Sequence, residues 1–395
     1  MTDVFKRTAL ATRLAKTILE GGPVSAASSG LFLSAPRRTG KSTFIREDLR
    51  PVLEAQGALV LYVDLWENKQ IDPGQVIVTA VRAELAKHDG VVTKLAKSIG
   101  LEKVSIAGAL AFSLDKVGMG QSVSLSMALR TLSDEIQKPI VLVIDEAQQA
   151  ITTGNGSDTL FALKAARDEI NSSLHYGLRI VCTGSNQDKL AMLRNSKDQA
   201  FFGAALVNFP PLDRAYVAWF CERVQLEEPL QVDAVLELFK RASYRPEILY
   251  AAGDVVKLDF ETPADGIAAR FAQAVEAQIA ASNTDALQVA HSLTVLQSAV
   301  LRVLAARGNK FAPFEAPTHA DYLSVVRATS PGHTITPDDS NVQQALAALQ
   351  DKSLIWRAAR GVYLLEEASL AQLLGDEGFL DVVPGYRAQG LDSAE

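Results

Sequence analysis

The chain has 395 residues and a formal net charge of −7, so it is too long for one ordinary domain and we expect two or three. Its acidity argues against a protein whose whole surface binds nucleic acid, and its two cysteines exclude a disulfide framework. Because no run of about 18 apolar residues occurs, we expect a soluble, cytoplasmic protein with no membrane partner.

A stretch near the N-terminus has the sequence pattern of a phosphate-binding turn. After a helical pattern over 4–20, the apolar run 30–33 leads into APRRTGKST, which matches GxxxxGK[ST] with alanine at the first glycine position. We expect a strand before the turn and a helix after it, over 44–49. The nucleotide-binding candidates are Ala35, Pro36, Arg37, Arg38, Thr39, Gly40, Lys41, Ser42 and Thr43.

The residue types in this turn suit a triphosphate. Backbone N–H groups over 38–42 can wrap around a phosphate, and Gly40 permits the main-chain conformation that aims them inward. Lys41 would reach the β- and γ-phosphates, the Ser42 hydroxyl would ligate Mg²⁺, and Thr43 would steady the α-phosphate. If the position of Ala35 requires a positive φ, the alanine costs about 1 kcal/mol there.

The segment after the turn is expected to contain a second buried strand, over 58–64, and a helix over 73–87. Residues 91–126 are expected to be an insertion, in which 104–114 and 117–125 have the alternation and the turn residues of a hairpin or a mobile segment. Such a segment can contact a partner, or it can be a peripheral hairpin with no function of its own. A helix over 127–137 follows.

A second motif, PIVLVIDE over 139–146, supports a nucleotide site. Five consecutive apolar residues followed by two acids describe a strand that is buried on both faces and delivers carboxylates at its C-terminal end. In open α/β sheets this end is where ligands bind. Asp145 would hold Mg²⁺, directly or through water, and Glu146 would polarise the attacking water as a general base.

A loop is expected at 154–157, with a helix after it. A further strand, over 177–182, then ends in small polar residues. Thr183, Ser185 or Asn186 could sense whether a γ-phosphate is present. Small polar residues after a strand are also ordinary turn formers, so the choice among the three stays open.

The region 212–285 has only helical patterns and is expected to form a helical lid. The helices are expected over 213–224, 232–241, 245–257 and 263–280. Arg245 opens one of them, next to Pro246, which suits a first helical turn. A lid could present this guanidinium to a phosphate, and a plain surface role is the alternative.

The region 286–370 is predicted to be a winged-helix domain, because three helical patterns precede two short apolar runs around a turn. From residue 281 onward there are 8 basic and 13 acidic residues, and the helix expected to read DNA, 341–350, has no Lys or Arg. Phosphate neutralisation supplies most non-specific affinity for DNA. A protein contact or a packing role is therefore favoured, although Arg357 and Arg360 could touch a DNA backbone.

Four motifs, SAPRRTGKSTF, VLVIDEAQQ, CTGSN and RPEIL, resemble those of bacterial and archaeal ATPases of the AAA+/STAND region of the P-loop class that carry a winged-helix domain. Relatives include archaeal origin-binding initiators and ATP-dependent regulators of transposition. The resemblance implies an α/β fold with five parallel strands in the order 5-1-4-3-2, and bound ATP and Mg²⁺. Together with the patterns along the chain, it predicts an ATPase core over 1–211 with the 91–126 insertion, a lid over 212–285 and a winged-helix domain over 286–370. The segment 371–395, beyond the resemblance, is expected to be a peripheral acidic tail.

The resemblance also implies self-association in which an arginine of one subunit completes the site of the next. Arg194 lies in the region where such ATPases place this arginine, and Lys197 and Arg214 are its rivals. The sequence departs from its relatives at Ala35 and at 201–204, where many have an arginine after a Tyr-Gly pair. Fast hydrolysis depends on this residue, since such an arginine can be worth about 10³ to 10⁵ in rate.

We therefore expect an oligomeric ATP-dependent molecular switch that hydrolyses ATP with Mg²⁺ and engages a protein or nucleic-acid partner. The catalytic candidates are Lys41, Glu146, Ser185, Asn186, Arg194 and Arg245, and the metal candidates are Ser42 and Asp145. The alternative is a DNA-associated regulator or scaffold that ATP only orders, with negligible turnover. A metabolic kinase is a third hypothesis, which no substrate-binding constellation supports.

Overall fold

The computed structural model describes most of the chain in two units. The described residues are 4–20, 26–68, 70–98, 123–171, 175–195, 198–261, 263, 266–359, 361–367 and 369–386. Lys197, Arg360 and most of the predicted insertion, 99–122, lie outside these ranges. The two compact units are Met1–Arg223 with Tyr244–Pro246, and Val224–Ser243 with Glu247–Glu395.

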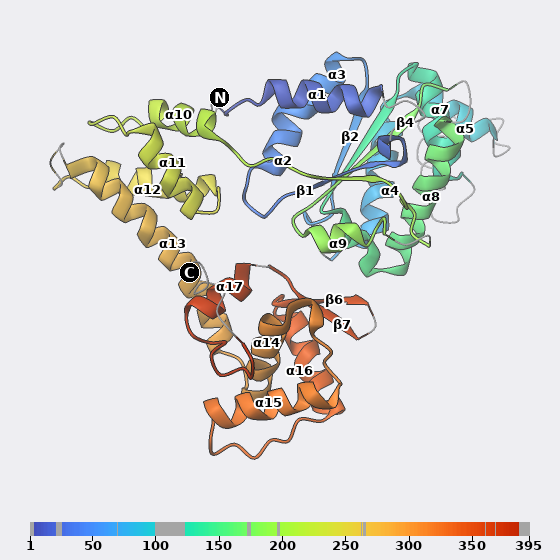
Figure 1. Cartoon of the computed structure of the whole chain (residues 1–395). Helices are drawn as coiled ribbons and strands as arrows, with labels where there is room; N and C mark the ends of the chain where they lie inside the picture. Colours follow the sequence, from blue (N-terminus) through green and yellow to red (C-terminus); the bar gives the residue numbers. More distant parts are fainter. Residues whose placement is uncertain are drawn as a thin grey trace. The chain divides into compact units, whose positions relative to one another are not determined.

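A five-stranded parallel sheet forms the centre of the first unit (Figure 1). Its strands are β1 (Leu31–Ser34), β2 (Leu59–Asp64), β3 (Ile140–Asp145), β4 (Leu178–Gly184) and β5 (Ala205–Asn208). Their order is β2-β3-β4-β1-β5, and every neighbouring pair is parallel. This is the predicted order 5-1-4-3-2 read from the other edge, so the predicted α/β sheet is confirmed.

Helices cover both faces of this sheet (Figure 1). The helices of the first unit are α1 (Thr8–Leu19), η1 (Ala26–Ser29), α2 (Lys41–Phe44), η2 (Ile45–Leu49), α3 (Arg50–Ala55), α4 (Pro73–Leu85), α5 (Asp89–Ser98), α7 (Leu125–Ile136), η3 (Ala147–Thr152), α8 (Gly154–Asn171), α9 (Gln187–Ala191) and α10 (Arg214–Arg223). Side chains of β3 alternate between the two faces, as a strand requires. Val141 and Val143 pack with α1, α2, η2 and α3, whereas Ile140, Leu142 and Ile144 pack with α4, α5, α7 and α8.

One local prediction in this unit was wrong. Residues 154–157 are the first turn of α8 and not a loop, because the Thr153 hydroxyl accepts a hydrogen bond of 3.0 Å from the Gly156 amide and satisfies one free donor of the helix start. Residues 91–98, at the start of the predicted insertion, lie in α5, and their buried valine and leucine side chains follow a helical spacing. The hairpin predicted over 104–125 lies outside the described residues as far as 122, and its last residue, Leu125, begins α7.

The second unit consists of helices and one antiparallel hairpin. Its elements are α11 (Val232–Arg241), α12 (Pro246–Lys257), α13 (Ile267–His291), α14 (Val295–Arg307), η5 (Gly308–Lys310), α15 (Ala316–Thr329), α16 (Asp339–Asp351), β6 (Ile355–Ala359), β7 (Val362–Leu365) and α17 (Ser369–Asp376). Three helices and a hairpin thus stand in the predicted order, and the winged-helix assignment stays a prediction. The predicted lid is divided between the two units, and its boundary at 285 falls inside α13, so the domain limits also stay predictions.

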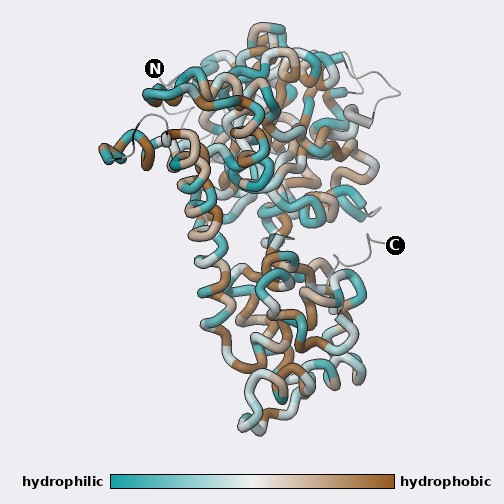
Figure 2. The backbone as a smooth tube through the Cα atoms, turned by 60° about the vertical axis from the view of Figure 1, so that its left-hand side comes forward, coloured by the Kyte–Doolittle hydropathy of each residue, from teal (hydrophilic) through white to brown (hydrophobic). Residues whose placement is uncertain are grey.

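The C-terminal segment is part of the core of the second unit and is not peripheral as far as residue 386. Leu374, Leu380 and Val383 are buried in that core. Arg302 of α14 donates a hydrogen bond of 2.8 Å to the carbonyl of Phe379, which ties the segment to the helix. Apolar segments occupy the interior of each unit in Figure 2. Among the described helices, none combines the length and the apolar character that crossing a membrane requires.

Candidate functional site

The predicted phosphate-binding turn joins β1 to α2. Gly40, which precedes the first residue of α2, has a φ of 83°, and Arg38 has a φ of 62°, so two residues of the turn are left-handed. The Thr39 hydroxyl donates a hydrogen bond of 2.7 Å to the carbonyl of Pro36 and closes the turn. Ala35 is buried and is not among the described residues with positive φ. The alanine at the first glycine position therefore causes no backbone strain.

Two acids at the end of β3 meet the lysine of this turn. Successive side chains of a strand point to opposite faces, but Glu146 leaves the strand with a φ of 52°, and its amide donates a hydrogen bond of 3.0 Å to Asp145 Oδ1. Both carboxylates consequently reach Lys41, whose Nζ lies 3.2 Å from Asp145 and 3.1 Å from Glu146. All three side chains are buried.

Three hydroxyl groups surround the carboxylate of Asp145. Ser42 donates a hydrogen bond of 2.6 Å and Tyr62 one of 2.8 Å to Oδ2, and Thr183 donates to Oδ1. Burial raises the pKa of Asp145, but the Lys41 charge and the three hydrogen bonds outweigh burial and lower this pKa to about 2. Burial, together with the neighbouring Asp145 charge, raises the pKa of Tyr62. Asp145 is therefore a carboxylate and Tyr62 a neutral donor at neutral pH.

Glu146 accepts hydrogen bonds on both of its carboxylate oxygens. Lys41 donates to Oε1, and both Gln148 Nε2, at 2.5 Å, and the Ser185 hydroxyl, at 3.0 Å, donate to Oε2. Asn186 has a different task, because its Oδ1 accepts a hydrogen bond of 3.0 Å from the Lys189 amide and caps α9. Of the two residues, Ser185 is the one that lies against the acids.

Arg37 links the turn to the tips of two neighbouring strands. Its guanidinium lies 4.1 Å from the ring centroid of Trp66, and its Nε donates to the Ser185 hydroxyl at 3.4 Å. Asp64, at the end of β2, accepts a hydrogen bond of 2.8 Å from the Trp66 amide. Burial, with the nearby charge of Asp145, raises the pKa of Asp64. The tips of β1, β2, β3 and β4 thus meet around one cluster of charges.

The residues at this cluster fit a magnesium ion bound together with phosphates. The hydroxyl of Ser42 and the carboxylate of Asp145 are oxygen ligands that already lie within hydrogen-bonding distance of each other. Among the described residues, no group of three or more His, Cys, Asp or Glu side chains could hold a metal. Mg²⁺ at phosphate sites usually relies on one or two carboxylates together with substrate phosphates, so this donor set matches it.

Comparison with solved structures identifies the fold. A Walker-type ATPase of Pyrococcus abyssi matches with a TM-score of 0.50 and 17% identity over 94% of this chain and 99% of that chain. The ORC2 protein of Aeropyrum pernix in its ADP form matches with a TM-score of 0.54 and 13% identity over 96% and 95%. The chain has the P-loop ATPase fold of the AAA+ type. No family model and no curated protein matches the sequence.

The three arginines predicted to act at the site lie on different segments of the first unit. Arg194 donates through Nε to the carbonyl of Ala204 and through Nη1, at 3.3 Å, to Asn195. Arg214 opens α10. Arg245 follows two left-handed residues, 243 and 244, and belongs to the first unit. The roles of these arginines stay predictions.

Sequence reasoning missed two residues of the candidate site, Tyr62 and Gln148. Tyr62 stands in an apolar strand, where an aromatic residue is ordinarily part of the core. The available signal was Asp64, which marks the functional end of the strand. Because Tyr62 lies two positions before Asp64, the two side chains point to the same face. Gln148 gave no comparable signal, because its place depends on the left-handed turn at Glu146.

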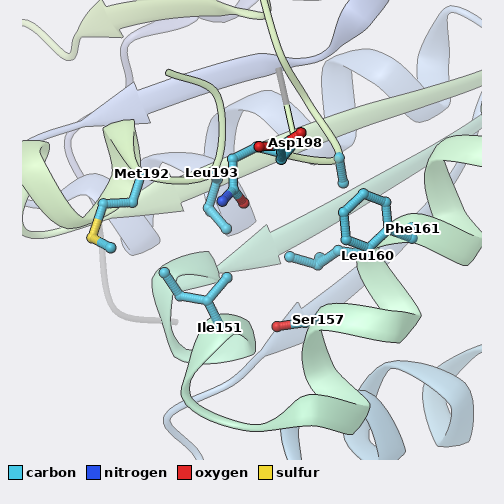
Figure 3. Close-up of a pocket in the computed structure, with 9 residues that line it drawn as sticks. Ile151, Ser157, Leu160, Phe161, Met192, Leu193 and Asp198 are labelled. Atoms are coloured by element: carbon cyan, nitrogen blue, oxygen red, sulfur yellow. The ribbon is translucent and has the colours of Figure 1, made fainter. Parts of the chain in front are cut away.

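Leu212 lies close to the turn. A Cβ atom on Gly40 would lie 3.7 Å from Cδ1 of Leu212, the residue two positions before α10. The first unit also contains a cavity of about 300 Å³ between η3, α8 and the residues after α9, and Figure 3 shows side chains that line it. Its lining residues are Ile151, Ser157, Leu160, Phe161, Met192, Leu193, Asp198, Gln199 and Ala200. This lining is mostly apolar and supplies no constellation of catalytic groups.

Proposed function

We propose that this chain binds ATP with Mg²⁺ at the β1–α2 turn and hydrolyses it as a molecular switch. The observation that carries the proposal is the placement of the Lys41 ammonium within 3.2 Å of both acids at the tip of β3, beside a turn with a left-handed Gly40. A lysine and a pair of acids in this relation to an amide-lined turn serve to grip a triphosphate and activate water.

In this proposal the amides over 38–42 and the Lys41 ammonium bind the phosphates. The positive end of α2 and of the helical turns that continue it adds to the attraction. Ser42 and Asp145 hold the metal, and Tyr62 fixes the orientation of the Asp145 carboxylate. Bound Mg²⁺ supplies positive charge against the phosphate oxygens.

Glu146 is the proposed general base, which takes a proton from the attacking water. Its Oε2 faces Ser185 and Gln148 and its Oε1 faces Lys41, so its two oxygens are held in a defined orientation. Ser185 is the proposed reader of the γ-phosphate, since its hydroxyl lies between Glu146 and the Arg37 guanidinium. Asn186 keeps a supporting role as the cap of α9.

We also propose that ATP controls self-association, with Arg194, or one of its rivals Lys197 and Arg214, completing a neighbouring subunit's site. Measuring the size of the particle with and without a non-hydrolysable ATP analogue tests this part. Growth with the analogue supports it, and the same size under both conditions contradicts it.

A second function is a DNA-associated regulator or scaffold that ATP orders and that turns over negligibly. The observation that favours it is the engagement of Arg194 with its own chain at Ala204 and Asn195, which occupies a guanidinium needed for fast turnover. A mobility-shift titration against salt tests the DNA component, because binding through phosphates has a steep salt dependence.

The deciding experiment compares ATP binding and turnover in the wild type and in Glu146→Gln. We expect Mg²⁺-dependent binding in both proteins and a turnover about 10² to 10⁴ times slower in the variant, with retention of ATP. Glu54→Gln is the control, because Glu54 is an exposed acid paired with Arg50 on α3. Equal, near-zero rates in the wild type and in Glu146→Gln would favour the scaffold.

A further inference from the structure

Three donors hold the carboxylate of Glu146, and the proposed function gives two of them another task. Lys41 binds Oε1 and is also the proposed phosphate ligand, and Ser185 binds Oε2 and is also the proposed reader of the γ-phosphate. The third donor is the side-chain amide of Gln148, whose Nε2 lies 2.5 Å from Oε2. A phosphate that engages Lys41 and Ser185 would leave Gln148 as the donor dedicated to Glu146.

The surroundings of Gln148 fix its amide behind the acid. The side chain is only 4% exposed. A Cβ atom on Gly184, at the end of β4, would lie 2.5 Å from Gln148 Oε1, so the amide can occupy this place only because position 184 has no side chain. Gln148 Oε1 is buried and has no hydrogen-bond partner in the described structure. Burying an acceptor without a partner costs free energy. This cost argues that the amide is kept in this place for the hydrogen bond that Nε2 donates to Glu146.

The main chain gives a reason why Glu146 needs such a donor. Glu146 lies in the left-handed region, which residues other than glycine, asparagine and aspartate seldom adopt, and its side chain therefore leaves the alternation of β3. Gln148 is two residues further along, in the first turn of η3, and closes a short loop from the side chain of one residue to that of the other. The hydrogen bond thus restricts the rotation of the carboxylate.

We infer that Gln148 is the positioning residue of the general base. Its amide keeps Oε2 of Glu146 in place when Lys41 and Ser185 turn to the phosphates, and the glycine at position 184 makes room for that amide. This inference rests on the proposed ATPase function, because it assigns a task only if Glu146 acts on water.

The test is a double-mutant cycle between Glu146→Gln and Gln148→Leu, measured as ATP turnover and as Mg-ATP dissociation constant. We expect Gln148→Leu to lower kcat by about 10²-fold, the scale of a misplaced catalytic group, with the dissociation constant within about threefold of the wild type. If Gln148 acts through Glu146, the double variant is no slower than Glu146→Gln alone. A merely structural role would give losses that multiply.

Two more variants separate the donor from the fold. Gly184→Ala leaves the amide intact and displaces it, so it should reproduce the loss of kcat without a loss of ATP binding. Gln149→Leu is the matched control, because the neighbouring glutamine is not among the donors to the Glu146 side chain. We expect it to keep the wild-type kcat.

The outcomes distinguish the two claims. If the wild type turns over ATP much faster than Glu146→Gln but Gln148→Leu matches the wild type, only the role of Gln148 is overturned. Losses that multiply in the double variant, or a dissociation constant that rises in parallel with the loss of kcat, overturn it as well. If the wild type is as slow as Glu146→Gln, the proposed hydrolysis falls, and the role of Gln148 falls with it.

Discussion

Removal of the Lys41 ammonium should destabilise the first unit in addition to abolishing nucleotide binding. Lys41, Asp145 and Glu146 are 5%, 1% and 9% exposed, so Lys41→Ala leaves two buried carboxylates with no cation between them. Removing one partner of a buried ion pair costs about 3–5 kcal/mol. Because hydroxyl groups continue to donate to Asp145, we expect the lower end of this range, about 3 kcal/mol.

This loss should shrink as the pH falls. In the wild type the pKa of Asp145 is lowered from 3.8 to about 2, so its carboxylate contributes stability above pH 3.8 that is lost as the pH falls toward 2. In Lys41→Ala, burial is no longer opposed by the ammonium and the pKa of the same carboxyl group rises. As the pH falls, Asp145 of the variant therefore takes up a proton first, which removes the cost of its buried charge. The wild type loses the stability contributed by its own Asp145 only at a lower pH. The difference in unfolding free energy should therefore be largest near pH 7 and smaller near pH 4.

Urea unfolding at both pH values measures the effect. The two units can unfold in separate transitions, and a Trp356→Phe background leaves tryptophan fluorescence to Trp66 and Trp219 of the first unit. Lys41→Arg is the control, since it keeps a cation between the acids and should lose much less stability. A loss below about 1 kcal/mol at pH 7, or the same loss at both pH values, would refute the reasoning.

The remaining predictions concern stability. Gly40→Ala should cost about 1–2 kcal/mol of stability, because the φ of Gly40, 83°, is left-handed. Ala35→Gly should lower stability by about 0.4–1 kcal/mol, because glycine gives the unfolded chain more conformational entropy. A gain in stability would show that the backbone at position 35 is strained. Tyr62→Phe removes a hydrogen bond to the charged Asp145 and should cost about 1.5–3 kcal/mol in the same urea titration, with a neutral result arguing against that bond. Leu380→Ala removes most of a side chain that is 1% exposed and should cost about 2–5 kcal/mol in the unfolding transition of the second unit. Unchanged stability would instead support the prediction that the tail is peripheral.

The central sheet could be predicted because its strands carry local signals. Each buried strand is a short apolar run. One of these runs leads into the turn that contains GKS and another ends in DE, which locates the edge where ligands bind. The order of the strands did not follow from these runs alone and came from the family resemblance. The C-terminal segment was misread because its glycines, proline and acids outweighed Leu380 and Val383, whose partners lie on distant helices.

The contacts within the candidate site were less predictable than its main residues. The turn and the two acids are contiguous motifs, so Lys41 and Asp145 could be named in advance. Tyr62 reaches Asp145 only because β2 and β3 pair in a register that sets Asp64 beside Asp145. No local pattern specifies that register, because two continuous apolar runs can be aligned in several registers that fit the sequence equally well.

Leu212 limits the space beside the phosphate-binding turn. A Cβ atom added at Gly40 would lie 3.7 Å from Cδ1 of Leu212, which is an ordinary van der Waals distance. The leucine therefore leaves space for a methyl group on that side of the turn and little more. Replacing Leu212 with the larger Phe should crowd the main chain at Gly40 and change the affinity for ATP, although neither side chain carries a charge.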